Sequence, residues 1–324
     1  MKFLTCFKYF LLFIFSLLLP AGCSDDGGVT GVSSDIVTDP FPLALGNRWE
    51  YTLEQSIFVH EDTTQPPITK SSTGRQVLTI NRTEMISGDE AFGVTFYHVM
   101  DYLFTEGADT VMETHYLASR RDKVILKAEE RVYNPTGGFI PFSKTDNVAR
   151  IGTKIKVGGV SRFITLERLA HLLLDSGTFY YLAADNANTA LASDGIQNKD
   201  NVFYYTEDYI FVFNELYKGK NWVSAAAQGV GEVNITQEVT NILSELGEFD
   251  GPIAEVELLN RFIVATASEQ YKIRFYYKSG VGLVQAEISD PEFMIWRWRS
   301  DGSIEFLGIG TWTFIKKLVD YTVK

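Results

Sequence analysis

Short runs of β-branched and aromatic residues, separated by turn-forming residues, recur along most of this 324-residue chain. Such runs favour strands, because side chains of these types pack well on a pleated surface. Most gaps between runs are only a few residues long, which suits hairpins and is too short for the crossovers that parallel strands need. The clearest runs are RQVLTI (75–80), FGVTFYHV (92–99), DKVILKA (122–128), NVFYYTEDYIFVF (201–213), EVELLNRFIVATA (255–267) and YKIRFYYK (271–278). We therefore predict a mainly β fold built on a large antiparallel sheet.

Two segments depart from the strand pattern. In residues 164–177 the leucines recur at helical spacing, as at Leu166, Leu169 and Leu173, and a glycine closes the segment. This spacing predicts a short amphipathic helix. Residues 236–249 predict a second one. We therefore expect one or two short helices packed on the sheet.

A Leu-x-x-Gly-x-x-Trp pattern occurs twice, in LALGNRW (43–49) and LYKGKNW (216–222). Glycine can turn the chain with a positive φ, and a tryptophan three residues later can then begin a strand with its ring in the core. The pattern therefore indicates a structural role. Residues 293–309 predict a hairpin that turns at Asp301 and Gly302, with Trp296 and Trp298 on one strand face.

The N-terminus carries two lysines, an apolar run over residues 9–19 and small residues before Cys23. A basic start, a short apolar run and a small-residue exit are typical of a secretory signal peptide, here residues 1–22. The run is too short to span a bilayer as a helix. The sequence LPAGC resembles the lipobox of bacterial lipoproteins, with Pro20 where leucine is usual. This resemblance implies that Cys23 carries the lipid and begins the mature chain.

The domain organisation follows from these boundaries. Residues 23–39 are rich in small and polar residues and predict a flexible tether. Residues 40–324 predict a single β-rich domain with an insertion at about 134–200. Ser24, directly after the cysteine, is compatible with sorting to an outer membrane, and we expect an outer-membrane lipoprotein whose body faces either the periplasm or the cell surface.

Charge and cysteine content exclude several classes of function. Loss of Lys2 and Lys8 with the signal peptide changes the formal net charge from −12 to −14. An acidic chain repels nucleic acid, so we expect no nucleic-acid partner. Cys6 and Cys23 are the only cysteines in the sequence, which leaves the mature chain without a disulfide or a cysteine metal site. We expect no cofactor.

The histidines are the first candidates for chemistry, and they are His60, His98, His115 and His171. The chain has neither the His-Glu-x-x-His zinc pattern nor the Gly-x-Ser-x-Gly nucleophile elbow. Glu113 and His115 should share a strand face, and His98 with Asp101 forms a looser pair. We interpret them as polar faces of half-buried strands, and we predict no catalytic or metal residue and no enzyme.

Aromatic residues are the candidates for ligand binding, and the four that we single out are Tyr204, Tyr276, Trp296 and Trp298. They could line a concave apolar cavity that takes a lipid or a hydrophobic polypeptide segment. The Trp-Arg-Trp-Arg run over residues 296–299 could also form a sugar-stacking or cation–π surface. The alternative that we place first is that the aromatic residues pack in the core.

Four segments carry a resemblance to a known group, and they are DPFPLALGNRWEY (39–51), KGKNW (218–222), GEFDGPIAEVEL (247–258) and YYKSGVGLVQAEI (276–288). Together they resemble uncharacterised envelope lipoproteins of Bacteroidetes-type bacteria, which share a PLxxGNxWxY opening and a GVGLV strand. The resemblance implies a curved antiparallel sheet, similar to the half-barrel of periplasmic lipoprotein carriers. It implies no known activity.

Three functional hypotheses follow for a lipid-anchored envelope protein. The first is a non-enzymatic protein that binds a hydrophobic ligand or lipid, which predicts an apolar pocket with few acidic residues. The second is a surface interaction, adhesion or scaffold protein, which predicts a filled core and an exposed apolar patch. The third is a hydrolase, which needs histidines and acidic residues to converge in space.

Overall fold

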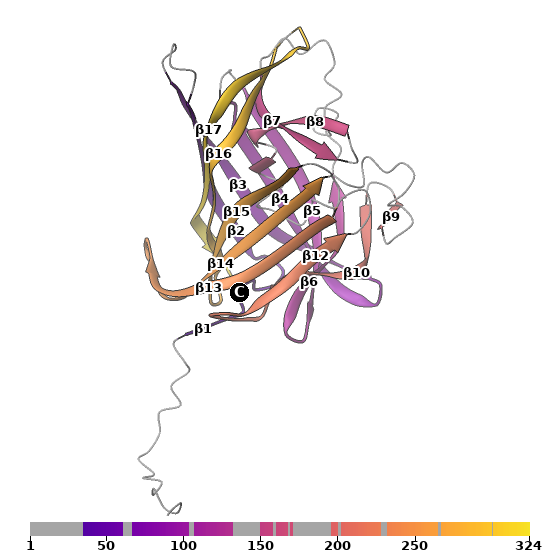
Figure 1. Ribbon diagram of the computed structural model, residues 1–324. Coiled ribbons are helices and arrows are strands. Elements are labelled where there is room, and N and C mark those ends of the chain that lie inside the picture. Colours follow the sequence, from indigo (N-terminus) through magenta and orange to yellow (C-terminus); the bar gives the residue numbers. More distant parts are fainter. Residues whose placement is uncertain are drawn as a thin grey trace, which may run out of the picture. The chain divides into compact units, whose positions relative to one another are not determined.

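Seventeen strands, joined mostly by tight hairpins, build nearly all of the described chain (Figure 1). The computed structural model describes residues 35–60, 67–103, 107–131, 150–157, 160–167, 169–170, 196–199, 202–227, 232–264, 267–299 and 301–324. The strands are β1 (Ile36–Thr38), β2 (Arg48–His60), β3 (Ile68–Ile86), β4 (Asp89–Asp101), β5 (Ala108–Arg120), β6 (Lys123–Arg131), β7 (Arg150–Val157), β8 (Val160–Thr165), β9 (Ile196–Lys199), β10 (Val202–Phe213), β11 (Glu215–Tyr217), β12 (Asn221–Ala227), β13 (Glu232–Leu246), β14 (Phe249–Val264), β15 (Ala267–Lys278), β16 (Gly282–Trp298) and β17 (Ile304–Thr322).

One antiparallel sheet contains all of these strands except β1 and β11. Its hydrogen-bonded order is β12-β13-β14-β15-β16-β17-β2-β3-β4-β5-β6-β10-β9, and β7 joins the far end of β16 and pairs with β8. Neighbours in the sheet are therefore mostly neighbours in sequence, as the hairpin spacing predicts. The prediction of a mainly β fold on a large antiparallel sheet is confirmed.

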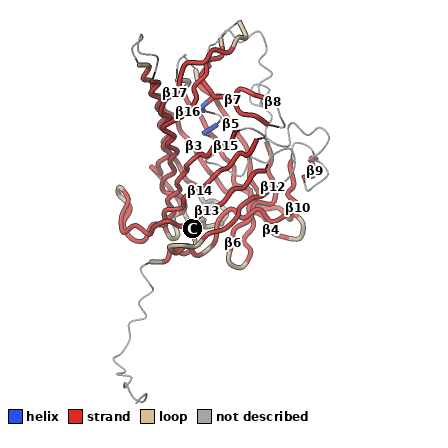
Figure 2. Tube along the Cα trace, viewed as in Figure 1, coloured by secondary structure: helices blue, strands red, loops and turns tan. Residues whose placement is uncertain are grey.

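The sheet curves so strongly that its two ends approach each other (Figure 2). Trp222 of β12 meets Phe213 of β10 edge to face, with ring centroids 5.5 Å apart. The side-chain amide of Gln237 donates to the backbone carbonyl of Phe211 at 3.5 Å. No backbone ladder joins β10 to β12 in the described residues, so side chains hold this seam.

The core lies on the concave face of the sheet, which we call the inner face. On β2 the inner residues Trp49, Tyr51 and Leu53 are at most 1 % exposed, while Thr52 and Glu54 on the outer face are exposed. Alternation of this kind is what a strand with one buried face requires.

Both Leu-x-x-Gly-x-x-Trp patterns have the predicted structural role. Gly46 and Gly219 turn the chain with φ of 89° and 86°, conformations that side-chain-bearing residues rarely adopt. Trp49 and Trp222 lie three residues later, within the first two residues of β2 and β12, and both are buried.

The folded body begins inside the segment that the sequence predicts as a tether. β1 pairs with β11, and Val37 is completely buried. The backbone N–H of Thr38 donates to Ser279 Oγ at 2.9 Å. Residues from Ile36 onward are therefore part of the β-rich body.

The two predicted helices have different outcomes. Leu166, Leu169 and Ala170 are helical and buried in the main core, so the helix prediction over 164–177 is confirmed at these residues, whereas residues 164 and 165 lie in β8. Residues 236–249 lie in β13, the turn after it and the start of β14, so the second prediction is wrong. Pairing of β13 with strands on both sides outweighs the weak helical spacing of this segment. No described helix is long and apolar enough to cross a membrane.

Candidate functional site

A cluster of polar side chains lies on the inner face of strands β3 to β6. His98, Glu113, His115 and Glu129 are each at most 2 % exposed, and Gln76 beside them is completely buried. Their placement follows from strand register, because Gln76 pairs with His98 and His115 pairs with Glu129. We call Gln76, His98, Glu113, His115 and Glu129 the inner polar cluster.

The imidazole of His115 lies between two carboxyl groups. Its Nε2 atom is 3.5 Å from Glu113 Oε1 and 4.0 Å from Glu129 Oε1. The ring also packs against Phe96, with centroids 4.4 Å apart. A protonated imidazole here would be attracted to both carboxylates, and this attraction is stronger in a buried site than in water.

Other buried polar groups continue along the inner face from the inner polar cluster. Gln55 accepts from Trp312 Nε1 at 3.2 Å and donates to Glu167 Oε1 at 3.3 Å. Lys316, which is 1 % exposed, places its ammonium 4.5 Å from the ring centroid of Tyr51. The interior therefore carries charged side chains of both signs, packed among aromatic rings.

The histidine prediction is corrected by these positions. Glu113 and His115 do share a strand face, but that face is the buried interior rather than a half-exposed surface. His98 lies on the same inner face as His115, while Asp101 is exposed. The side chains of His60 and His171 lie outside the described residues.

The chemistry open to the inner polar cluster is limited by burial. An imidazole beside two carboxylates has the residue types of an acid–base site, but a substrate would have to reach side chains that the protein covers. In the described parts of the chain, no group of three or more histidine, cysteine or acidic residues is arranged to hold a metal ion. We interpret the cluster as a set of polar contacts that fix strand register.

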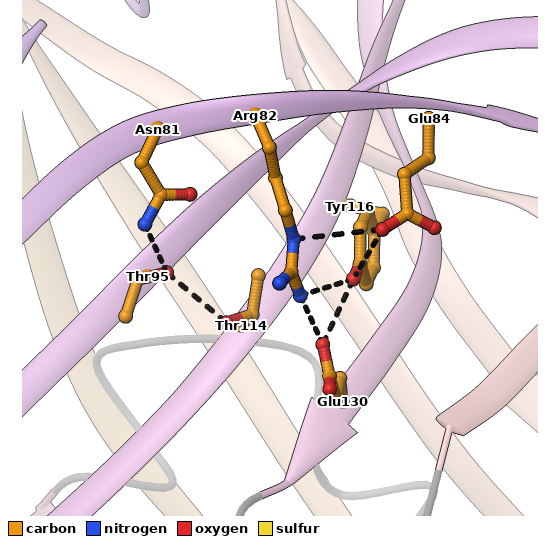
Figure 3. Close-up of polar contacts among 7 residues, drawn as sticks. All are labelled: Asn81, Arg82, Glu84, Thr95, Thr114, Tyr116 and Glu130. Atoms are coloured by element: carbon orange, nitrogen blue, oxygen red, sulfur yellow. Dashed lines mark hydrogen bonds and ion pairs between the residues drawn. The ribbon is translucent and has the colours of Figure 1, made fainter. Parts of the chain in front are cut away.

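A second polar network lies on the outer face of the same strands (Figure 3). The Tyr116 hydroxyl is 2.8 Å from Glu130 Oε2 and 3.2 Å from Glu84 Oε1, and the guanidinium of Arg82 bonds to both Tyr116 and Glu130. Burial raises the pKa of Tyr116, and its hydrogen bond to Glu130 raises it further. The phenol therefore stays neutral and serves to join three strands.

Next to this network, hydroxyl and amide groups form a short ladder (Figure 3). Thr95 and Thr114 are opposite each other on β4 and β5, with their hydroxyl oxygens 3.1 Å apart. Asn81 donates to Thr95 Oγ1 at 3.4 Å. These pairs stabilise the outer surface of the sheet without forming a concave site.

Tyr204 and Tyr276, two of the predicted ligand residues, belong to different clusters. Tyr276 on β15 is 7 % exposed and belongs to the main hydrophobic core, as the core-packing alternative predicts, and burial and a hydrogen bond to Glu287 raise its pKa. That glutamate also pairs with Arg274 at 2.9 Å. Tyr204 is on β10, packed against a small outer cluster that includes Ala128. The structure therefore does not bring these two tyrosines together.

Trp296 lies near the far end of β16, partly exposed, and the side chain of Trp298 lies outside the described residues. Cys23, the predicted lipidation site, also lies outside them.

The hairpin formed by β16 and β17 carries an exposed apolar surface that the sequence did not reveal. Met294 pairs with Ile309, and Trp296 pairs with Phe306 across the strands. Met294, Phe306 and Ile309 are 42 %, 47 % and 50 % exposed, and the rings of Trp296 and Phe306 lie 4.8 Å apart. We call these four residues the tip patch.

Charged side chains lie on the opposite face of the same hairpin. Arg297 pairs with Glu305 across the strands, and Glu305 accepts from Arg299 at 2.9 Å and lies 3.6 Å from Arg297. Gly302 closes the hairpin with a φ of 83°, as the Asp-Gly pair predicts. The two faces of the hairpin therefore differ, and the tip patch is the apolar one.

No family model matches the chain, and no curated protein matches its sequence. Two solved structures are similar to this chain. A "putative lipoprotein" from Parabacteroides distasonis has 10 % sequence identity and a TM-score of 0.32, covering 88 % of this chain and 99 % of its own. A "putative exported protein with YmcC-like fold" from Bacteroides fragilis has 5 % identity and a TM-score of 0.29, covering 89 % and 99 %.

Proposed function

We propose that this chain is a lipid-anchored protein of the cell envelope, and that its β-rich body is a non-enzymatic binding module that contacts a protein partner through the tip patch. The envelope location is supported by the signal-type N-terminus and by Cys23 in its lipobox-like setting. The observation that carries the binding role is the exposure of Met294, Phe306 and Ile309 side by side on one hairpin.

The composition of the tip patch favours a protein as its partner. Single exposed apolar residues are common, but adjacent ones that form one patch are typical of interaction sites. Tryptophan is enriched at the points that contribute most to protein–protein binding, and Trp296 lies in the patch beside Phe306.

The interior supports this proposal over a carrier of hydrophobic ligands. Trp49, Tyr51, Trp312 and Phe314 are at most 1 % exposed, as are the charged side chains of Lys316 and Glu113. Side chains that line a solvent-filled or lipid-filled chamber would keep accessible surface, and charge there would oppose an apolar ligand. The burial of these side chains therefore favours a packed core over a ligand-filled chamber in the described part of the interior.

Site-specific photo-crosslinking in intact cells tests the proposal. A benzoylphenylalanine side chain is placed at Phe306, at Ile309 and, as a matched control, at Tyr97, which is 47 % exposed on β4 away from the patch. We expect one protein adduct, of the same identity, from the two patch positions and none from Tyr97.

The decisive control is the variant Phe306→Asp. It should abolish the adduct formed from position 309 while leaving the midpoint of thermal unfolding unchanged, since Phe306 is half exposed. An adduct that survives Phe306→Asp, or that also forms from Tyr97, would contradict binding at the patch. An adduct removed by glycosidase would replace the protein partner with a glycan.

A further inference from the structure

Backbone hydrogen bonds join the residues around β1 to the body of the protein. The backbone N–H of Asp39 donates to the carbonyl of Asn214 at 2.8 Å, and the N–H of Gly280 donates to the carbonyl of Asp39 at 3.2 Å. Together with the β1–β11 pairing, these bonds make Ile36 the point where the tether leaves the body. The C-terminus lies at the same end (Figure 1).

The length of chain before this point limits its distance from a lipid anchor. Cys23 precedes Ile36 by thirteen positions. Even fully extended, these positions reach only about 45 Å. The tip patch lies toward the other end of β17, whose 19 residues extend about 60 Å. The anchor therefore holds the β1 end close to the bilayer and leaves the tip patch remote.

Exposed side chains at the β1 end suit a lipid surface. Leu45, Tyr217 and Tyr321 are 43–49 % exposed. Tyr217 is in β11, the partner of β1, and Leu45 lies beside Gly46, which meets the C-terminal Lys324. Three exposed lysines, Lys218, Lys317 and Lys324, lie there among the exposed acidic residues Asp35, Asp39, Glu215 and Asp320, so the apolar and aromatic side chains rather than a positive charge suit a lipid surface. Amphipathic aromatic rings and lysines with apolar stems are favoured at the headgroup level of a membrane.

We propose that the β1 end of the body rests on the lipid headgroup surface through Leu45, Tyr217 and Tyr321, so that the tip patch faces away from the membrane. This inference rests on the proposed anchor at Cys23. It assigns the body two surfaces with different partners, a lipid surface at one end and a protein at the other.

Energy transfer from single labelled cysteines to a lipid dye tests this orientation. Residues 1–23 are replaced by a histidine tag that binds nickel-chelating lipid in vesicles of phosphatidylethanolamine and phosphatidylglycerol. Both native cysteines are then absent, so Lys218→Cys, Thr73→Cys and Ser303→Cys each give a unique label. Lys218 lies at the β1 end, Thr73 lies opposite Glu54 in the middle of β2, and Ser303 lies at the hairpin tip.

We expect transfer to fall severalfold from position 218 through 73 to 303. Equal transfer at 218 and 303, or more at 303, would overturn the orientation. The lipid contact is tested by combining Leu45→Ser, Tyr217→Ser and Tyr321→Ser with the label at 218, which should lower transfer. The matched control, Tyr97→Ser with Met112→Ser, removes exposed apolar groups elsewhere and should leave it unchanged.

If the triple variant keeps full transfer at 218, the contact is wrong and the tether alone sets the orientation. Because the histidine tag replaces the native lipid anchor, the vesicle experiment tests the orientation of the body whether or not Cys23 is lipidated. Native lipidation is measured independently by the mass of the Cys23 peptide, so either proposal can fail without the other.

Discussion

The indole nitrogen of Trp49 donates a hydrogen bond to the backbone carbonyl of Val281, 232 positions further along the chain, at 2.5 Å. The next residue, Gly282, has a φ of +113°, and a Cβ there would lie 3.0 Å from that same nitrogen. We expect Gly282→Ala to lower the free energy of unfolding by about 2–4 kcal/mol, because it adds backbone strain to a crowded contact. Urea unfolding followed by tryptophan fluorescence measures the change.

The matched control is Gly280→Ala. Gly280 also has a positive φ of 64°, but a Cβ there meets no atom within 4 Å. Its substitution should cost only the left-handed backbone, about 1–2 kcal/mol. Equal losses for the two variants would mean that the Trp49 contact contributes nothing specific.

Removal of the imidazole from the inner polar cluster should destabilise the fold. His115→Leu leaves Glu113 and Glu129 buried in the same region without the ring that lies between them. We expect a loss of about 1–3 kcal/mol, the usual cost of leaving buried polar groups without a polar neighbour. Met112→Ala, on the exposed face of the same strand, should change stability by only about 0.5 kcal/mol. A wild-type unfolding midpoint for His115→Leu would show that the cluster is not structural.

Lowering the pH should weaken the contact that Asp89 makes between the β3–β4 hairpin and the β5–β6 hairpin. Arg120 donates two hydrogen bonds to this carboxylate and Lys127 lies 3.0 Å away, so these partners hold the pKa of Asp89 below its ordinary value. A lowered pKa means that the carboxylate stabilises the fold above its unfolded pKa of about 4, and that this stability is lost as pH falls through the lower folded value.

Asp89→Asn should therefore be less stable than wild type at pH 7, with the difference vanishing in strong acid. Urea unfolding at a series of pH values measures it. The exposed Asp101→Asn is the comparison variant and should follow wild type at every pH. A constant gap between Asp89→Asn and wild type at all pH values would rule out the ionised contact as its cause.

Lipid attachment should depend on one cysteine. Cys23 lies in the lipobox-like sequence, whereas Cys6 lies in the segment that the signal peptidase would remove. In a lipoprotein-processing bacterial host, we expect a mature N-terminal peptide that carries diacylglycerol on Cys23. Cys23→Ser should eliminate lipid incorporation, and Cys6→Ser should leave it intact. Detection of an unmodified Cys23 in the mature wild-type protein would refute the anchor.

The sequence by itself determined the class of fold and several local features. Runs of β-branched and aromatic residues at hairpin spacing gave the antiparallel sheet, because strand pairing between neighbours needs only local signals. The turns at Gly46, Gly219 and Gly302 followed from residue chemistry in the same way, since a positive φ suits glycine. The helix prediction for residues 236–249 was wrong because the helical spacing is weak and the pairing of β13 with its sequence neighbours β12 and β14 outweighs it.

The tertiary structure alone decided which faces are buried. Alternation places Glu113 and His115 together, but a two-residue period is the same for an inner and an outer face, so the interior position depended on the curvature of the whole sheet. The tip patch depended on a bulge, because the register shift opposite Trp296 brings Phe306 and Ile309, three residues apart, onto one face. Strand identity is local in sequence, whereas the choice of face and the bulges that alter it are fixed by contacts between distant strands.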